Sequence, residues 1–254
     1  MKKMILSLTE ASMNDTPNTR PSLRVHLIRS AGTHNQLNDI IPATGDAISE
    51  LGKEQIGALV DEWLRDKPHI DAIYHSPLPR AVQTLRELRK AFRAETQSPE
   101  GFPSQETFNA ILSIFRPGRV VMERNDDRLR EIDRGPLGGS PRDQAYTPDV
   151  LREMHQLNMD YRFPEGESMH DVAQRMRYWL EEVTTEAVKH NWSSIVAITH
   201  ELAIKCLLQR LIGLDPRTAW LHELRHTSIT TLELVHGNWR LIRFNATPHL
   251  PPEW

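Results

Sequence analysis

The sequence predicts a three-layer α/β/α sandwich built around a mostly parallel central sheet. Short apolar runs alternate along the chain with longer segments of helical periodicity. The early apolar runs end in small or polar residues, which is typical of buried strands that lead into loops. Strands that alternate with helices favour a parallel sheet covered by helices on both faces.

Apolar runs at residues 24–29, 70–75 and 194–199 predict three buried strands, and residues 119–122 predict a fourth. Residues 229–235 and 239–244 predict a closing hairpin around His236-Gly237-Asn238. Ligands of such sheets bind outside the carboxyl ends of the strands. We therefore expect one rim of the sheet to carry the pairs Arg29-Ser30, His75-Ser76 and Thr199-His200.

Four segments have the pattern of long helices. The first spans residues 48–63, and the second opens with Ser76-Pro77-Leu78-Pro79, where prolines are tolerated in the first turn. Residues 168–190 form an amphipathic pattern, and residues 201–213 form a mostly apolar one that ends at a glycine.

The chain divides into a leader and one domain. Residues 1–22 are rich in polar residues and proline, so we expect a flexible leader, followed by a single domain over residues 23–254. Residues 97–118 and 136–165 interrupt the alternation with proline, glycine and polar residues. We interpret both stretches as insertions that form a lid over the rim.

The composition of the chain excludes several classes of binding partner and cofactor. The formal net charge is -3, and no basic patch is interleaved with aromatics, so we expect neither nucleic acid nor a membrane as partner. The single cysteine, Cys206, forms no internal disulfide, and no apolar run is long enough to cross a bilayer, which favours a cytoplasmic protein. No Gly-x-Gly-x-x-Gly follows the first strand, and we expect no cofactor. His222 and His226, four residues apart, are assigned structural or surface roles rather than zinc binding.

Residues from separate strand ends suggest an anion site. Arg29, Arg80 and His200 would bring two guanidinium forks and an imidazole to one pocket, a set suited to phosphate oxygens. Glu131 follows the predicted strand at residues 119–122 and is a candidate general acid. A single arginine at a strand end is more often part of a surface ion pair. The occurrence of Arg29, Arg80, Glu131 and His200 together, in this order along the chain, is what indicates function.

That ordered set resembles the histidine phosphatase (phosphoglycerate mutase-like) superfamily from about residue 24 to residue 250. The family's Ser-Pro-Leu-x-Arg-Ala-x-Gln-Thr segment appears at residues 76–84 as Ser-Pro-Leu-Pro-Arg-Ala-Val-Gln-Thr. Further counterparts are Leu-Ile-Arg-Ser-Ala-Gly at residues 27–32, Leu-x-Glu-x-x-x-Gly at 129–135, Gly-Glu-Ser at 166–168, Thr-His at 199–200 and Thr-Ser-Ile-Thr at 227–230.

The resemblance implies roles for individual residues. In this family a first histidine attacks phosphorus, two arginines and a second histidine hold the phosphoryl oxygens, and a glutamate protonates the leaving group. Carried over by position, Arg29, Arg80 and His200 would bind phosphate and Glu131 would be the acid. Asn35 would reach the phosphate too, although its loop is one residue shorter than the usual pattern.

Two positions depart from the family pattern. Ser30 stands at the position of the nucleophilic histidine, so we expect ordinary phosphohistidine chemistry to be absent. Glu201 follows the second histidine where the family often has glycine, and its charge should weaken the binding of a dianion unless it points away.

A serine hydroxyl attacks only when a base takes its proton. His200 is one candidate base, His34 is a looser one, and His26 is given little weight because it should be buried in the sheet.

Three interpretations of Ser30 remain open. The chain is an enzyme in which Ser30, Glu131 and His200 carry altered or impaired phosphomonoesterase chemistry, or it is a pseudoenzyme that binds a phosphorylated metabolite or protein segment. A third alternative is an active phosphatase into which serine was introduced at this position. In each case the expected small-molecule partner is a phosphate ester or another anion.

Overall fold

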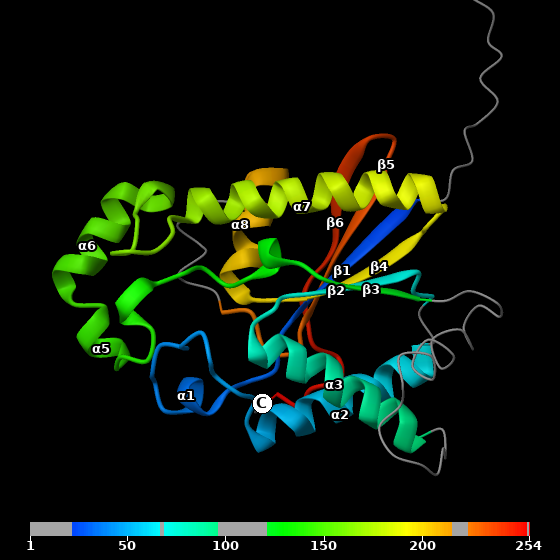
Figure 1. Ribbon diagram of the computed structural model, residues 1–254, viewed down its shortest axis with the longest axis horizontal. Coiled ribbons are helices and arrows are strands. Elements are labelled where there is room, and N and C mark those ends of the chain that lie inside the picture. The colour runs from blue at the N-terminus through cyan, green and yellow to red at the C-terminus, as the bar shows by residue number, and fades with distance from the viewer. Residues whose placement is uncertain (1–21, 67–68, 96–120, 215–222, 253) are drawn as a thin grey trace, which may run out of the picture.

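The computed structural model describes residues 22–66, 69–95, 121–214, 223–252 and 254. Its centre is a six-stranded sheet in the order β3-β2-β4-β1-β5-β6. Helices α2 and α3 cover one face of this sheet and helices α7 and α8 cover the other, as Figure 1 shows. The predicted three-layer α/β/α architecture is therefore confirmed. The strands are β1 (Leu23–Arg29), β2 (Ala72–His75), β3 (Met122–Asn125), β4 (Ser194–Thr199), β5 (Ile229–Val235) and β6 (Asn238–Ala246).

The first four strands in the sequence pair in parallel. Strand β4 lies between β2 and β1, with His75 opposite Ile198 and Arg29 opposite Thr199. Strand β5 runs antiparallel to β1, and β6 runs antiparallel to β5. The sheet is therefore mostly parallel and is closed at one edge by the predicted hairpin.

The strand predicted at residues 119–122 lies later in the chain than expected. The structure begins β3 at Met122, opposite Ala72, and continues it through Glu123 and Arg124. Strand β3 is an edge strand with one neighbour, so its later residues are partly solvated and tolerate charge. The apolar run at residues 119–122 therefore reaches only the first residue of this strand, and the rest of the strand is polar.

Alternation along the strands divides the core into two layers. In β1, Val25 and Leu27 face α7 and α8, whereas Ile28 faces α2 and α3. Every residue of β4 is buried, as expected for a strand covered on both faces.

Helices α2 (Glu50–Asp66) and α3 (Pro79–Glu95) pack against each other on one face. Their apolar stripes supply Ile56, Leu59, Val60, Leu85 and Leu88 to the core. Helix α3 begins at Pro79, whose missing N–H is not needed in a first turn. This start sets Arg80 at the rim of the sheet.

The opposite face carries α7 (Met169–His190) and α8 (Glu201–Ile212). Ser168 caps α7 with a reciprocal capping box to Asp171, and Gly213 ends α8 in the left-handed conformation. The side chains of Trp179 and Cys206 are fully buried between these helices and the sheet. Burial raises the pKa of the Cys206 thiol, so this cysteine has an inert packing role.

Residues 136–165 contain more regular structure than their composition predicts. They include α5 (Arg142–Ala145), α6 (Pro148–Leu157) and short 3₁₀ turns at Gly135–Leu137 and Asn158–Asp160. Thr147 caps α6, and Pro148 occupies its first position. With α1 (His34–Leu37), these helices lie beyond the end of the sheet where the site is expected (Figure 1). The other predicted insertion, residues 97–118, and residues 1–21 of the predicted leader lie outside the described residues.

Within the ranges that the structure describes, no helix is both long enough and apolar enough to cross a bilayer.

Arg175 of α7 holds the loop that follows β3. Its guanidinium pairs with both carboxylate oxygens of Glu167 at 2.8 and 2.9 Å. It also donates to the backbone carbonyls of Arg128, Arg130 and Glu131 at 2.6, 2.7 and 3.2 Å. One side chain therefore satisfies three loop carbonyls, and it fixes the backbone that carries Glu131.

Arg175→Ala should destabilise the fold by about 2–3 kcal/mol, because charge-assisted hydrogen bonds to buried loop carbonyls are lost. Urea unfolding measures this change. Arg177→Ala is the matched control, since Arg177 pairs with Glu181 on the same helix and exposed pairs of this spacing contribute about 0.5 kcal/mol. Equal destabilisation by the two variants would contradict the role assigned to Arg175.

Candidate functional site

Three loops meet at the rim of the sheet, each one leaving the carboxyl end of a parallel strand. The ladder extends one residue beyond the strands: Ser30 N–H donates to Thr199 O at 2.8 Å and Ser76 N–H donates to Ile198 O at 2.9 Å. Ser30, Ser76 and His200 are 3%, 0% and 2% exposed. The rim predicted from the strand ends is therefore present, and its floor is buried.

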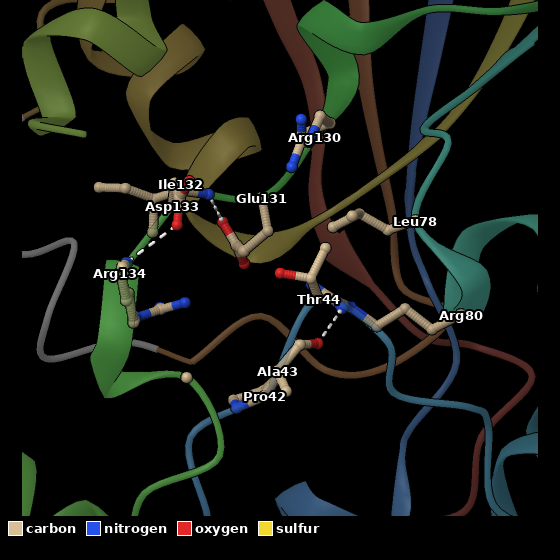
Figure 2. Close-up of a pocket in the computed structure, with 12 residues that line it drawn as sticks. Pro42, Ala43, Thr44, Leu78, Arg80, Arg130, Glu131, Ile132, Asp133 and Arg134 are labelled. Atoms are coloured by element: carbon tan, nitrogen blue, oxygen red, sulfur yellow. Dashed lines mark hydrogen bonds between the residues drawn. The ribbon is translucent and has the colours of Figure 1, made fainter. Parts of the chain in front are cut away.

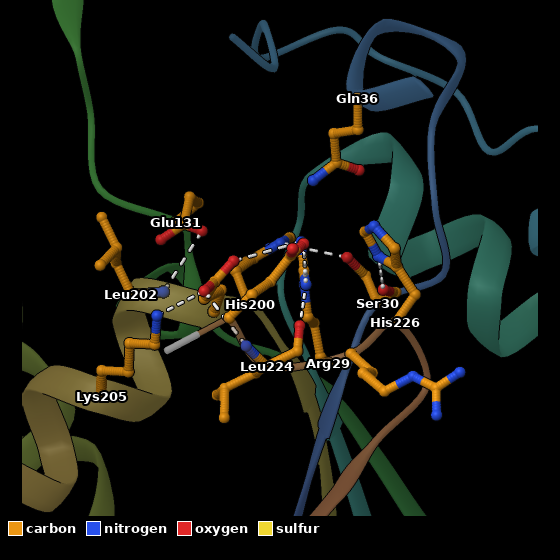
Figure 3. A network of polar contacts seen from close by, with 12 residues as sticks. Arg29, Ser30, Gln36, Glu131, His200, Leu202, Lys205, Leu224 and His226 are labelled. Carbon is orange, nitrogen blue, oxygen red and sulfur yellow. Dashed lines mark hydrogen bonds and ion pairs between the residues drawn. The ribbon is translucent and has the colours of Figure 1, made fainter. Parts of the chain in front are cut away.

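His200 is the centre of this cluster (Figure 3). Arg80 Nε donates to His200 Nδ1 at 3.2 Å, and the Ser30 hydroxyl lies 3.4 Å from the same nitrogen. Because arginine only donates, Nδ1 is the accepting nitrogen and Nε2 carries the hydrogen. That hydrogen is donated to Ser76 Oγ at 2.8 Å.

Burial holds the pKa of His200 well below its ordinary value, and the nearby cations Arg80, Arg175 and Arg29 lower it further. Near neutral pH its imidazole is therefore uncharged, which agrees with the tautomer that its partners require.

Arg80 lies in the first turn of α3 with its side chain turned into the rim. It is 4% exposed, and a second donor of its guanidinium reaches the Ala43 carbonyl at 3.2 Å. Burial lowers the pKa of Arg80 to about 10. The group stays cationic near neutral pH, in surroundings where a charge interacts more strongly than in water.

Arg29 is surrounded by acceptors from its own chain. One guanidinium nitrogen lies 3.2 Å from Glu201 Oε2. The other donates to Glu223 Oε1 at 3.1 Å and to the Leu224 carbonyl. The positive charge expected to bind phosphate is therefore already compensated by two carboxylates.

Glu201 lies against Arg29 and does not point away from the site. Its carboxylate also pairs with Lys205 and accepts the Leu224 N–H at 3.2 Å. Burial opposes ionisation of Glu201, but Arg29 and Lys205 outweigh it and lower the pKa of the carboxyl group. Glu201 is therefore a fixed negative charge beside the phosphate-binding candidates.

Glu131 lies on the opposite side of His200 from Ser30 (Figure 3). Its Oε1 accepts the Ile132 N–H at 2.9 Å, and its Oε2 accepts the Leu202 N–H at 3.4 Å. Leu202 is in the first turn of α8, where unpaired N–H groups favour an acceptor. The start of α8 thus positions Glu131 at the rim.

A cleft opens beside this cluster and has Arg80 and Glu131 in its wall, as Figure 2 shows. Its empty volume is about 370 Å³, solvent-open space included. Arg130 and Arg134 also line it, and Arg134 Nε is held by Tyr146 Oη at 3.1 Å. The cleft wall therefore carries three arginines and two carboxylates, those of Glu131 and Asp133.

The polar loop after Ser30 does not bring Asn35 to His200. The Asn35 amide donates to Asp46 Oδ1 at 2.8 Å, because the capping box of α1 turns this loop on itself. Its neighbour Gln36 points toward the cluster instead (Figure 3). Of the weaker base candidates, His34 is exposed, and His26 contacts Thr231 Oγ1 at 3.1 Å, inside the sheet.

His226 joins the site although the sequence assigned it a structural or surface role. It lies in a turn before β5 and not on a helix, and its Nδ1 is 3.1 Å from the Ser30 carbonyl oxygen. The strand topology could have predicted the position of His226. Since β5 runs antiparallel to β1, the residues that precede β5 meet the end of β1. Its proposed companion, His222, lies outside the described residues.

Within the described ranges, no three histidine, cysteine, aspartate or glutamate side chains are grouped so as to hold a metal ion.

Comparison with known proteins agrees with this geometry. The model of the histidine phosphatase superfamily (branch 1) matches residues 25–103 and 104–247. Phosphoserine phosphatase 1 of Hydrogenobacter thermophilus is 26% identical over 206 residues, which are 80% of this chain and 82% of that protein.

Solved structures share the fold. A mycobacterial glucosyl-3-phosphoglycerate phosphatase superposes with a TM-score of 0.66 and 24% identity, over 89% of this chain and 99% of its own. Phosphoserine phosphatase from Entamoeba histolytica, in complex with 3-phosphoglyceric acid, superposes with a TM-score of 0.67 and 21% identity, over 90% and 100%. The motif order, the topology and the family match together show that this chain belongs to the histidine phosphatase superfamily.

Proposed function

We propose that this chain binds a phosphate monoester of a small metabolite and hydrolyses it without forming a phosphohistidine at position 30. The observation that carries the proposal is the convergence of Arg80 Nε and Ser30 Oγ on His200 Nδ1, at 3.2 and 3.4 Å. The guanidinium of Arg80 and the hydroxyl of Ser30 can donate hydrogen bonds to phosphoryl oxygens at this place.

The cleft supports a small ligand. Arg80 lies in its wall as a cation for phosphate, and Glu131 in the same wall is available to protonate the leaving oxygen. The names of similar proteins include phosphoserine phosphatase and glucosyl-3-phosphoglycerate phosphatase, and one solved structure holds 3-phosphoglyceric acid. These names support a phosphate-bearing metabolite as the partner of this chain.

Ser30 limits the chemistry at the position that we assign to the family's nucleophile. His200 Nδ1 lies 3.4 Å from its hydroxyl, but this nitrogen already accepts from Arg80 and so is not available as a base. Without a strong base a serine hydroxyl is a poor nucleophile. We therefore expect turnover far below that of a phosphatase that uses histidine.

The alternative is a pseudoenzyme that binds a phosphorylated ligand without hydrolysing it. One observation favours it: Arg29 is neutralised by Glu201 and Glu223, so one of the two proposed phosphate-binding arginines is occupied. An active phosphatase into which serine was introduced at position 30 is the third interpretation. Restoring histidine tests all three.

Ser30→His should raise the turnover of phosphomonoesters at least about 100-fold, because covalent catalysis supplies several orders of magnitude in related systems. Phosphate release from a panel of phosphomonoesters measures it. His200→Ala in both backgrounds gives the rate that does not depend on this site.

The parent chain discriminates between the interpretations. Measurable turnover that His200→Ala abolishes supports the altered enzyme. No turnover in the parent and a gain in Ser30→His supports a binding module or an introduced serine. No turnover in either chain, with no binding of inorganic phosphate, would remove the phosphate-ester proposal altogether.

Glu201→Gln should raise the affinity for inorganic phosphate about tenfold, since relief of one competing charge at a partly buried site corresponds to about 1.4 kcal/mol. Isothermal titration calorimetry measures the affinity. Glu223→Gln is the matched control, because Glu223 also pairs with Arg29 but is 72% exposed, so its charge is largely screened. An unchanged dissociation constant in Glu201→Gln would show that Glu201 does not compete with phosphate.

A further inference from the structure

We infer that His226 is the general base of this site and takes the proton from the water that attacks phosphorus. The inference rests on the proposed function, because it assigns a residue to that reaction. Four observations carry it: the rigid placement of the ring beside Ser30, its tautomer, the occupied nitrogens of His200, and the charges of the two arginines.

The backbone on both sides of His226 is fixed to the end of β1. Thr227 N–H donates to Arg29 O at 3.1 Å, and Arg29 N–H donates to Ser228 O at 3.1 Å. Arg225 N–H donates to Asn245 Oδ1 at 2.7 Å on the neighbouring strand. These bonds hold the turn against the rim, so the imidazole does not depend on a mobile loop for its position.

The ring itself packs closely beside Ser30. A Cβ atom added to Gly32 would lie 3.3 Å from His226 Cδ2, so glycine gives the ring its space. Figure 3 shows the His226 ring next to Ser30, on the side from which Gln36 reaches in. The ring is thus a wall of the same cluster that holds Ser30 and His200.

The hydrogen bond of His226 fixes its tautomer. Its Nδ1 lies 3.1 Å from the Ser30 carbonyl oxygen, which only accepts, so Nδ1 carries the hydrogen. Nε2 then has a lone pair. The described residues give His226 Nε2 no hydrogen-bond partner. A nitrogen that can only accept does not bind an anion, but it is suited to take a proton from water.

His200 lacks this capacity. Its Nε2–H is donated to Ser76, and its Nδ1 accepts from Arg80. A proton could reach His200 Nδ1 only if Arg80 released that nitrogen. Of the two histidines in contact with Ser30, His226 is therefore the one with an available lone pair.

The charges around His226 favour proton uptake once substrate binds. Burial is the first cause of its lowered pKa, and the nearby Arg29 and Arg80 lower it further. The free site therefore contains a neutral base. A phosphate dianion bound beside Arg80 adds negative charge near the ring and raises its basicity at the moment of reaction.

The reaction balances with water as the second reactant. The water oxygen attacks phosphorus while one of its protons passes to His226 Nε2. The ester P–O bond breaks, its electron pair stays on the leaving oxygen, and Glu131 gives that oxygen a proton. The products are an alcohol and hydrogen phosphate. His226 then releases its proton to solvent and Glu131 regains one, so the net change is the consumption of one water.

His226→Asn tests this role sharply. An asparagine amide keeps a donor close to the position of Nδ1 for the Ser30 carbonyl, but it has no basic nitrogen at the position of Nε2. We expect kcat to fall about 100-fold or more, the usual contribution of a positioned base, while the dissociation constant of inorganic phosphate stays the same. His155→Asn, on the exposed face of α6, is the matched control.

His226→Ala adds an independent readout. Imidazole supplied in the buffer should restore part of the turnover of His226→Ala, because it replaces the missing base in the space left by the ring. A fall in kcat in His226→Ala that imidazole does not restore, together with parent-level kcat in His226→Asn, would show a structural role and would overturn the assignment.

The remaining outcomes also decide the question. An unchanged kcat in His226→Asn overturns the assignment, as does a parent chain that binds phosphate but hydrolyses no phosphomonoester. In the latter case phosphate recognition at Arg80 stands and only the catalytic part of the proposed function fails. A phosphoryl group trapped on His226 would also overturn it, since the residue would then be a nucleophile.

Discussion

The parallel pairing of β4 with β1 on one side and β2 on the other positions every group around His200. In this register the carboxyl ends of three strands stop at the same level, with Arg29 opposite Thr199 and His75 opposite Ile198. The next residues along the chain therefore meet, and Ser30, Ser76 and His200 form one buried cluster. Other elements place the remaining residues around this buried cluster. The start of α3 places Arg80, while Arg175 and the first turn of α8 hold Glu131, and the antiparallel pairing of β5 with β1 brings His226 to the site.

The cluster brings several cationic side chains together, and nearby carboxylates compensate part of their charge. Burial and the arginines keep His200 and His226 uncharged, so neither adds to the positive potential of the site. Glu201 and Glu223 compensate Arg29, and Arg80 remains the cation that faces His200. The compensated charge of Arg29 predicts weaker binding of a dianion than two uncompensated arginines would give. It also makes the carboxylate at position 201 as important to the site as the serine at position 30.

Much of the fold was predictable from local patterns. Buried strands such as β1 and β4 are continuous apolar runs, and α7 has both a regular apolar stripe and a serine cap. The edge strand β3 was placed too early because one-sided pairing leaves it free to carry charge. Residues 142–157 were expected only as part of a lid insertion, and their two helices bury Ala145 and Met154 and leave most of their other side chains exposed. For the site, Arg29, Ser30, Arg80 and His200 follow from strand ends and motif order, whereas the partners of Asn35 do not.

Motifs and apolar periodicity within short segments were sufficient to identify the family, the order of the elements and the residues at the strand ends. The pairing of charges became visible only in the folded chain. Glu201 turns onto Arg29, His200 has both nitrogens occupied, and His226 lies beside Ser30. In all three cases the contact joins residues that are 120 or more positions apart in the chain. Local pattern fixes which face of an element is apolar. The partner of a polar side chain is set by which elements pack together, and that is a property of the folded chain.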